Sequence, residues 1–431
     1  MMPRPPARRG ACPAFLSPME TGDGLLLRLV PLDGGLSPTQ LRGVATAAAA
    51  FGNGLVEVTA RGSLQVRGLQ PHTVAPLQDA ILALGIAPRT GLAIDVSPLA
   101  GRDPGEIADA RPLAAAIRAA TAALEGRLGP KVSVVIDGGG AVSLDGQKAD
   151  VRLGAVAAEG GPLWAVSIGG GAPQRMRAEA AATAAADALA CIATLGRRAR
   201  ATDLPGCTAG PDDAADAPAP LGLIPLKQGE AAFGVGLPFG AADAGLLHAL
   251  ADAAQAAGAV DLRPAPGRAL LATGRLSADA FAAAARQLGC LTGRDDPRAF
   301  IAACPGAPAC ACAHFPARAL APLVAAALAP LLDGTVRVHL SACAKGCAHP
   351  APATLTLVGM DAGVALVHEG APSQAAAPGL APDGLVAALA DLADGARAPG
   401  ESGRDLLARR IPAARWGMAA AGDATGPRMR T

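Results

Sequence analysis

The chain has 431 residues, of which 51% are apolar, so it is long enough for two or three domains with a substantial core. Its 37 Lys and Arg residues balance 36 Asp and Glu residues, and a net charge of +1 gives no global attraction for nucleic acid or an anionic membrane. Aromatic residues make up only 2%, with no tyrosine, which removes the stacking surfaces of a single-strand-binding protein.

No segment has the pattern of a membrane span or a secretion signal. Residues 1–15 contain arginines and prolines but no apolar stretch, so we expect a disordered tail and a cytoplasmic protein. The longest apolar run, Ala319 to Leu332, is interrupted by Pro322 and Pro330. It falls short of the roughly 20 strongly apolar residues that a spanning helix needs.

Two stretches, residues 16–80 and 222–285, share one order of elements. The first predicts a strand at Leu25–Leu32, a helix at Ser37–Phe51, and strands at Leu55–Val58 and Leu64–Val66; the second predicts a strand at Ala232–Leu237, a helix at Ala241–Ala257, and strands at Val260–Arg263 and Ala269–Ala272. Each stretch has the pattern of half a ferredoxin-like sheet, and neither buries its apolar face alone. We therefore expect both halves to pair into one sheet, related by a pseudo-twofold axis.

A longer α/β stretch follows each half, which makes the predicted fold class α+β. Residues 81–197 predict a helix at Arg111–Arg127, a strand at Lys131–Asp137, a hairpin through Gly138–Gly140 into Ala141–Leu144, a further strand and a helix at Gln174–Leu195. Residues 286–400 predict a helix at Ala317–Leu332, strands at Thr335–His339 and Thr354–Val358, and a helix near Leu385–Ala393. Residues 198–221 are rich in Pro, Ala and Asp and predict a linker, and residues 401–431 predict a C-terminal tail.

Five of the nine cysteines lie between residues 304 and 347. Cys304 and Cys310 form a C-x5-C pair, and Cys343 and Cys347 form a C-x3-C pair. Structural zinc prefers C-x2-C pairs, whereas these spacings suit the wider corners of a [4Fe–4S] cluster. The alternative is four buried apolar cysteines. Cys312 competes with Cys310 for one position, and spacing favours Cys310.

Several segments in this order resemble the sulfite/nitrite reductase superfamily and, within it, the precorrin-3B synthase family of aerobic cobalamin synthesis. They are GDGLLLRL (22–29), GNGLVEVTARGSLQVRG (52–68), SPLAGRDP (97–104), VVIDGGG (134–140), CPGAPAC (304–310) and HLSACAKGCAHPAPA (339–353). The resemblance implies duplicated ferredoxin-like half-domains, each followed by a reductase-type α/β domain. It also implies a [4Fe–4S] cluster, which the reductases couple to a sirohaem through a shared cysteine. The implied reaction hydroxylates precorrin-3A and closes a lactone, using O2 and two electrons.

The resemblance also indicates which basic residues are missing. Arg61 matches one cation that the reductases place around their anionic substrate, and Lys131 matches the first lysine of a Lys-x-Lys pair. Ser133 occupies the second position of that pair, and residues 91–95 contain no arginine. A site without these cations binds a small oxyanion poorly. We therefore expect the carboxylate-rich precorrin-3A as substrate, bound through Arg61, Arg67, Lys131 and Lys345, with Arg152, Arg263 and Arg268 as further candidates.

The source of electrons is expected to be another protein. No strand is followed by G-x-G-x-x-G, so a separate NADH-linked reductase or ferredoxin is predicted. His339, His349 and His314 are candidates for a mononuclear non-haem iron, with no ligand set assigned. Two other functions remain open: a sirohaem-dependent sulfite or nitrite reductase, and a non-catalytic iron–sulfur electron carrier.

Overall fold

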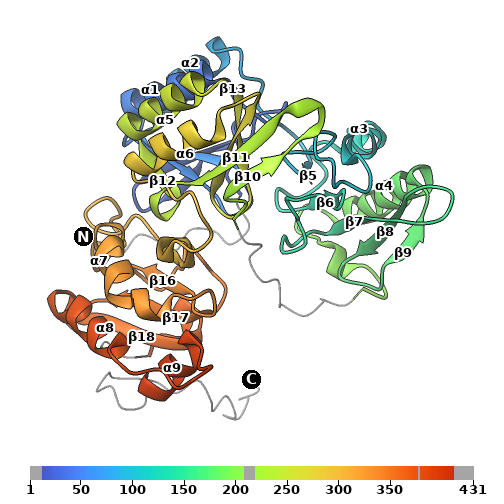
Figure 1. Ribbon diagram of the computed structural model, residues 1–431. Helices are drawn as coiled ribbons and strands as arrows, with labels where there is room; N and C mark the ends of the chain where they lie inside the picture. The colour runs from blue at the N-terminus through green and yellow to red at the C-terminus, as the bar shows by residue number, and fades with distance from the viewer. Residues whose placement is uncertain (1–11, 208–218, 377–378, 412–431) are drawn as a thin grey trace. The chain divides into compact units, whose positions relative to one another are not determined.

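The computed structural model describes residues 12–207, 219–376 and 379–411. The chain divides into two compact units, shown in Figure 1. The first unit comprises the residues up to 237 together with 241–294, and the second comprises 238–240 and the residues from 295 onward. The predicted tail residues 1–11, linker residues 208–218 and tail residues 412–431 lie outside the described residues.

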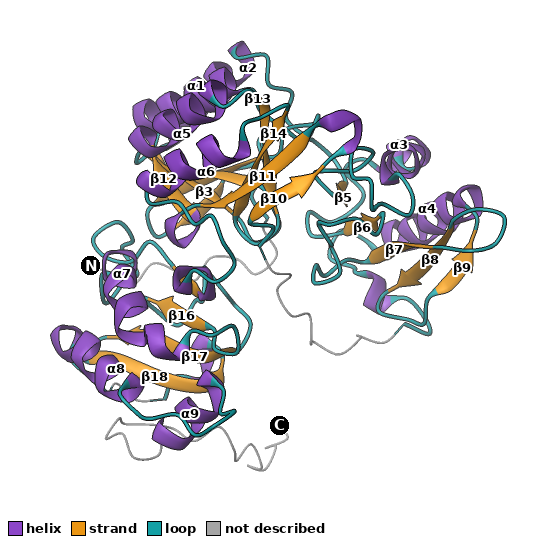
Figure 2. Ribbon diagram, viewed as in Figure 1, coloured by secondary structure: helices purple, strands orange, loops and turns teal. Residues whose placement is uncertain are grey.

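The two half-domains form two sheets in the first unit, rather than the single sheet expected from the repeat. One sheet has the order β1-β2-β4-β3-β12 and the other the order β10-β11-β14-β13. Figure 2 shows strands of both sheets in orange beside the helices of the half-domains. Their strands are β1 (Met19–Thr21), β2 (Gly24–Leu29), β3 (Leu55–Val58), β4 (Leu64–Leu69), β10 (Gly222–Pro225), β11 (Ala231–Gly236), β12 (Ala241–Asp243), β13 (Ala259–Ala265) and β14 (Ala269–Gly274). The halves are joined because β12, from the second half, pairs with β3, and because Leu36 and Arg61 make isolated bridges to Leu262 and Pro266.

The helices of the two halves share one core. They are α1 (Pro38–Phe51), α2 (Val74–Ala83), α5 (Ala244–Ala256) and α6 (Ala278–Gln287). Ser37 begins α1 as predicted, since its hydroxyl accepts from Gln40 N at 3.1 Å and the Gln40 side chain returns to Ser37 N. The predicted helix at Ala241–Ala257 starts three residues later, because 241–243 form β12 and Asp243 caps the helix through Leu246 N.

The remaining part of the first unit is an α/β domain with one sheet and two helices. The sheet has the order β5-β6-β7-β8-β9, with β5 (Ala93–Val96), β6 (Ser133–Asp137), β7 (Val151–Val156), β8 (Leu163–Ile168) and β9 (Gln174–Met176). β5, β6 and β7 run parallel, and β8 and β9 are antiparallel. The helices α3 (Ala110–Ala120) and α4 (Ala178–Leu195) pack in the same core.

Three predicted elements of this domain have different boundaries. α3 ends at Ala120 rather than Arg127, and a short 3-10 turn follows. Residues 141–144 form a loop instead of a hairpin strand, because Asp137 accepts the backbone N–H groups of Gly139 at 2.8 Å and Leu144 at 2.6 Å. The helix predicted from Gln174 begins at Ala178, since residues 174–176 pair with β8.

By length and composition alone, α4 is apolar enough to cross a membrane, and no other described helix is. Its residues Ala181, Ala185, Leu189 and Ile192 are fully buried against the sheet. The same length and composition are found in the core helices of globular domains.

The second unit contains a four-stranded sheet in the order β15-β16-β17-β18. Its strands are β15 (Ile301–Ala303), β16 (Val338–Ser341), β17 (Ala353–Met360) and β18 (Gly363–Gly370), and its helices are α7 (Ala317–Leu328), α8 (Leu385–Ala393) and α9 (Gly403–Arg410). β15, β16 and β17 run parallel, and β18 returns antiparallel to β17. The predicted helix at Ala317–Leu332 ends four residues early, because a 3-10 turn that includes Pro330 follows it.

Parts of all three segments predicted to lack structure belong to the fold. Phe15 is buried in the core of the half-domains, so the N-terminal tail stops before it. Within the predicted linker, Ala201 is buried and Arg200 pairs with Asp150 at 2.9 Å. Beyond residue 400, α9 buries Leu406 and Leu407 in the core of the second unit, where the sequence predicted only a tail.

The role of α9 leads to a stability prediction. We expect Leu406→Ala to lower the free energy of unfolding by about 2–5 kcal/mol, because it leaves a cavity in the core. Leu323→Ala is the matched control, since Leu323 is 53% exposed and its truncation costs little. Urea unfolding monitored by circular dichroism measures both variants. Equal stabilities for the two variants would contradict the packing of α9.

Candidate functional site

Two features of the structure are candidate functional sites: the cysteine loops of the second unit and a pocket in the first unit. The cysteine loops, residues 304–312 and 343–347, follow the adjacent parallel strands β15 and β16, in which Ala303 lies opposite Leu340. Parallel neighbours end at the same edge of a sheet, so the topology brings the two cysteine pairs together. The two cysteine pairs, distant in sequence, therefore come together because the strands that precede them are parallel neighbours in the sheet.

Cys304 begins the first cysteine loop directly after β15. It is buried, and its Sγ accepts a hydrogen bond from Ala342 N at 3.2 Å. Burial raises the pKa of the Cys304 thiol, which hydrogen bonds from Ala342 and Gly306 partly offset, while nearby Cys343 raises it further. Gly346 adopts a φ of 66°, as its place in the C-x3-C turn predicted.

Lys345 lies among the other cysteines. Its Nζ donates to the Sγ of Cys312 at 3.2 Å. This hydrogen bond raises the pKa of Lys345, partial burial opposes it, and the charges of Cys312, Cys343 and Cys347 raise it further. Lys345 was predicted to bind substrate, but the structure places its ammonium group against thiols. A cation there lowers the cost of gathering negatively charged sulfur atoms.

The histidines do not form a recognisable ligand set. His339 is fully buried on β16, with its ring 5.8 Å from that of His349, and His314 Nδ1 lies 3.3 Å from Asp361. Within residues 12–207, 219–376 and 379–411, no three His, Cys, Asp or Glu side chains are grouped closely enough to hold one metal ion. The ligands of a cubane bind four different iron atoms, so thiols that are farther apart remain suitable for a cluster.

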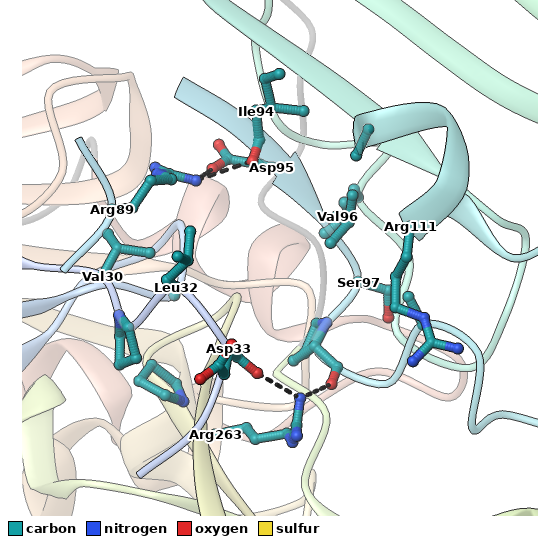
Figure 3. Close-up of a pocket in the computed structure, with 18 of the residues that line it drawn as sticks. Val30, Leu32, Asp33, Arg89, Ile94, Asp95, Val96, Ser97, Arg111 and Arg263 are labelled. Atoms are coloured by element: carbon teal, nitrogen blue, oxygen red, sulfur yellow. Dashed lines mark hydrogen bonds and ion pairs between the residues drawn. The ribbon is translucent and has the colours of Figure 1, made fainter. Parts of the chain in front are cut away.

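The second feature, the arginine pocket, lies between the half-domains and the α/β domain of the first unit (Figure 3). Its volume is about 410 Å³, within the range of small-molecule sites. The polar residues that line it include Arg61, Arg89, Arg102, Arg111, Arg118, Arg263, Asp33, Asp95 and Gln147. The lining thus holds six arginines and two aspartates, and three further carboxylates, those of Asp109, Glu230 and Asp261, pair with its arginines from outside the lining.

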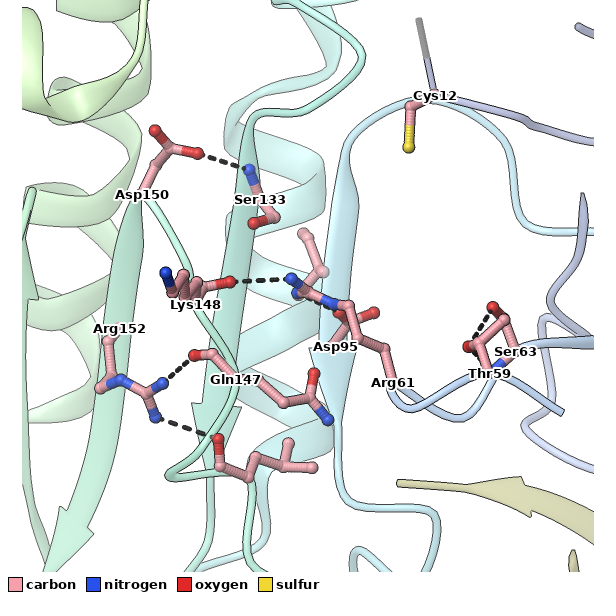
Figure 4. A network of polar contacts seen from close by, with 12 residues as sticks. Cys12, Thr59, Arg61, Ser63, Asp95, Ser133, Gln147, Lys148, Asp150 and Arg152 are labelled. Atoms are coloured by element: carbon pink, nitrogen blue, oxygen red, sulfur yellow. Dashed lines mark hydrogen bonds and ion pairs between the residues drawn. The ribbon is translucent and has the colours of Figure 1, made fainter. Parts of the chain in front are cut away.

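Asp95, on β5, holds two of these arginines. Its carboxylate lies 2.9 Å from Arg61 and 2.6 Å from Arg89, and Arg61 also donates to Lys148 O at 2.8 Å (Figure 4). Burial alone would raise the pKa of Asp95, but the charges and hydrogen bonds of Arg89 and Arg61 lower it overall. Residues 91–95, which contain no arginine, thus supply the carboxylate of Asp95. This carboxylate neutralises Arg61, the arginine that matches a substrate-binding cation of the reductases.

A second carboxylate, that of Asp261, holds two other arginines of the pocket. Asp261 lies 2.7 Å from Arg263 and 3.8 Å from Arg102, which also pairs with Glu230 at 3.0 Å. Arg263 further donates to the backbone oxygens of Asp33 and Pro98. Together with Arg111, which pairs with Asp109 at 2.7 Å, five of the six lining arginines are therefore held by carboxylates, and their directions in the pocket are fixed.

Three of the four predicted substrate ligands, Arg67, Lys131 and Lys345, do not line the pocket. Arg67 is buried, with Asp23 at 2.7 Å and Glu57 at 3.2 Å, so its guanidinium is saturated inside the half-domain. Lys131 is exposed just before β6 and is not a lining residue. Arg152 and Arg268 are also outside the lining, whereas Arg61 and Arg263 belong to it.

Sequence reasoning missed four lining arginines: Arg89, Arg102, Arg111 and Arg118. Arg111 and Arg118 are seven residues apart on α3, a spacing that puts both on one helix face and that the sequence already contained. Arg111 pairs with Asp109 at 2.7 Å, while Arg118 is exposed with no side-chain partner among the described residues. Arg118 is thus the most available cation of the pocket.

The pairing of Asp95 leads to a binding prediction. We expect Asp95→Asn to strengthen sulfite binding about tenfold or more, because it keeps the shape of the side chain while freeing Arg61 and Arg89 for an anion. Isothermal titration calorimetry measures the affinity. Asp252→Asn is the control, since Asp252 pairs with Arg42 at an exposed position. An unchanged affinity in Asp95→Asn would show that Asp95 does not limit anion binding.

The fold and the two sites define a class of protein. Residues 17–84 match the family model of the nitrite/sulfite reductase ferredoxin-like half domain. The solved structure of the Mycobacterium tuberculosis NirA protein shares the fold, with a TM-score of 0.62 over 89% of this chain and 83% of that chain, at 20% sequence identity. The chain therefore has the α+β fold of the nitrite/sulfite reductase type.

One curated relative narrows this class to a family. A precorrin-3B synthase from Sinorhizobium sp. is 40% identical over 427 residues, which cover 93% of this chain and 92% of that protein. The chain belongs to the precorrin-3B synthase family.

Proposed function

We propose that this protein catalyses the oxygen-dependent hydroxylation of precorrin-3A with closure of a lactone, in aerobic cobalamin synthesis. The observation that carries the proposal is the 40% identity to a precorrin-3B synthase along 93% of the chain. In this reaction one oxygen atom of O2 enters the product, and the other leaves as water with two electrons and two protons. The protein would act in the cytoplasm.

The arginine pocket supports a substrate with several carboxylates. Asp95 orients Arg61 and Arg89, Asp261 orients Arg263, and Glu230 with Asp261 orients Arg102. Arg111, which pairs with Asp109, and Arg118, which has no side-chain partner among the described residues, add two exposed cations. Acetate and propionate arms of one substrate would accept from the guanidinium donors that Asp95 and Asp261 leave unused, and several arms on one macrocycle could bind several arginines at once. A tetrapyrrole is larger than the pocket, so the pocket would take one edge of the macrocycle.

The cysteine loops support a [4Fe–4S] cluster held by Cys304, Cys310, Cys343 and Cys347. The donor set fits the group, because four thiols lie in two loops at one sheet edge, with a backbone N–H group on Cys304 Sγ and an ammonium group beside the other cysteines. A bound cluster would pass electrons one at a time from a separate NADH-linked reductase or ferredoxin. The ligands of a mononuclear iron remain unassigned, and a sirohaem would belong only to the reductase alternative.

The proposed reaction is tested by measuring how many oxygen atoms of O2 enter the product. The full chain, reconstituted anaerobically with iron and sulfide, is mixed with precorrin-3A, a reductant and 18O2, and the product is analysed by mass spectrometry. The expected product is a hydroxylactone that carries one labelled atom. Strong chlorin-type absorption with sulfite or nitrite reduction would instead support the reductase function. A reducible cluster without any tetrapyrrole binding would support an electron carrier.

A further inference from the structure

Gln147 is a buried residue with an unsatisfied carboxamide in the wall of the arginine pocket. It is 6% exposed, and neither its Nε2 nor its Oε1 has a hydrogen-bond partner among the described residues. A buried amide without partners destabilises a fold, since it loses its hydrogen bonds to water and gains none in return. Such groups in native structures call for an explanation, and a ligand site is one of the few available.

The backbone around Gln147 is fixed, so the unsatisfied side chain does not result from a loose loop. Gln147 N donates to Leu144 O at 3.0 Å, and Gln147 O accepts from the guanidinium of Arg152. The next carbonyl, that of Lys148, accepts from Arg61 at 2.8 Å, and Arg61 is itself held by Asp95 (Figure 4). Two arginines thus hold a short loop against the pocket, while no hydrogen bond to a described residue holds the carboxamide.

A carboxamide adds geometric selectivity that the charge of the arginines does not provide. The arginines attract any carboxylate, and their charge acts in many directions. An uncharged N–H donor recognises a carboxylate oxygen only at hydrogen-bonding distance and angle. A side chain that turns from its buried position toward a ligand gains bonds that it lacks in the free protein, so it responds to where one arm of the ligand lies.

We propose that Gln147 is a positioning residue whose Nε2–H donates to one carboxylate of the tetrapyrrole and thereby sets the orientation of the macrocycle in the arginine pocket. The inference rests on the proposed function and extends it to the choice of binding orientation. Charge brings the substrate in, and Gln147 selects among its carboxylate arms. A macrocycle bound in the wrong orientation would present the wrong carbon for oxidation, and two electrons and two protons would then reduce O2 to hydrogen peroxide without formation of the hydroxylactone.

The experiment compares Gln147→Met and Gln147→Glu with the unmodified protein. Affinity for precorrin-3A is measured by fluorescence under anaerobic conditions without reductant, so that it is independent of turnover. We expect Gln147→Met to bind about tenfold more weakly, the cost of one hydrogen bond to a charged group. Gln147→Glu should bind more weakly still, because it places a carboxylate against a carboxylate. In turnover, Gln147→Met should consume more O2 for each hydroxylactone formed.

Thermal unfolding distinguishes a role of Gln147 in positioning the substrate from a role in stabilising the fold. We expect Gln147→Met to unfold at the same or a higher temperature, because it removes an unsatisfied amide without loss of volume. Gln78→Met is the matched control: Gln78 donates to Phe15 O at 2.6 Å outside the pocket, so this variant should be less stable with unchanged affinity. Lower stability with unchanged affinity in Gln147→Met would overturn the inference alone. Absence of precorrin-3A binding to the unmodified protein would overturn the proposed function as well.

Discussion

Cys347→Ser is expected to abolish cluster assembly and turnover together. Thiolates are the ligands of iron–sulfur clusters, and a serine hydroxyl is harder and stays protonated at neutral pH, so three thiols would remain for a four-thiolate cluster. Iron and acid-labile sulfide, measured after anaerobic reconstitution, should both fall to background. The broad visible absorption of the cluster should disappear with them.

Three further variants test whether the effect is specific to the assigned ligands. Cys191→Ser, at an exposed position of α4 in the first unit, should retain the cluster and full turnover. Cys312→Ser should also retain it, whereas Cys310→Ser should not, if spacing assigns the ligand correctly. Full activity in Cys347→Ser, or loss of the cluster in Cys312→Ser with retention in Cys310→Ser, would contradict the assigned ligand set.

Arg67→Leu is expected to lower the free energy of unfolding by about 3–5 kcal/mol, because it leaves two carboxylates without their shared cation. The Arg67 and Asp23 side chains are only 7% and 2% exposed, and their carboxylate–guanidinium contact is bidentate at 2.7 Å. Arg42→Leu is the control, because its partner Asp252 is 68% exposed and surface pairs contribute about 0–1 kcal/mol. Urea unfolding measures both, and equal losses would show that burial does not strengthen the effect.

The same variant should change the pH dependence of stability. Burial alone would raise the pKa of Asp23, but the hydrogen bond and charge of Arg67 lower it below its ordinary value. Stability from this pair is therefore present above about pH 4 and lost as the pH falls toward the folded-state pKa. In Arg67→Leu, the hydrogen bond from Thr21 remains but the two contributions of Arg67 are lost, so burial raises the pKa of Asp23 relative to the unmodified protein and the deficit should shrink on acidification. A deficit that stays constant between pH 7 and pH 4 would exclude this linkage.

Interactions between residues close in sequence were readable from the chain itself. Ser37 and Gln40 cap α1 within three residues, β3 lies at the predicted residues, and Gly346 takes the positive φ that its turn requires. The order of motifs along the chain was sufficient to identify the family and the α+β fold class. These features depend on propensity, capping and spacing, which act over a few residues and need no knowledge of distant partners.

Only the tertiary structure decided which charged groups are available to a ligand. Arg61 and Arg67 belong to one sequence segment, residues 52–68, but the fold treats them differently. Arg67 is buried against Asp23 and Glu57. Arg61 lines the pocket, where it is held by Asp95, 34 residues away in the sequence. Arg102 meets Glu230 and Thr273, at separations of 128 and 171 residues. The sequence shows that an arginine is charged, but whether a carboxylate neutralises it depends on contacts that form only when distant strands have packed. For the same reason, the unsatisfied carboxamide of Gln147 became visible only in the folded chain.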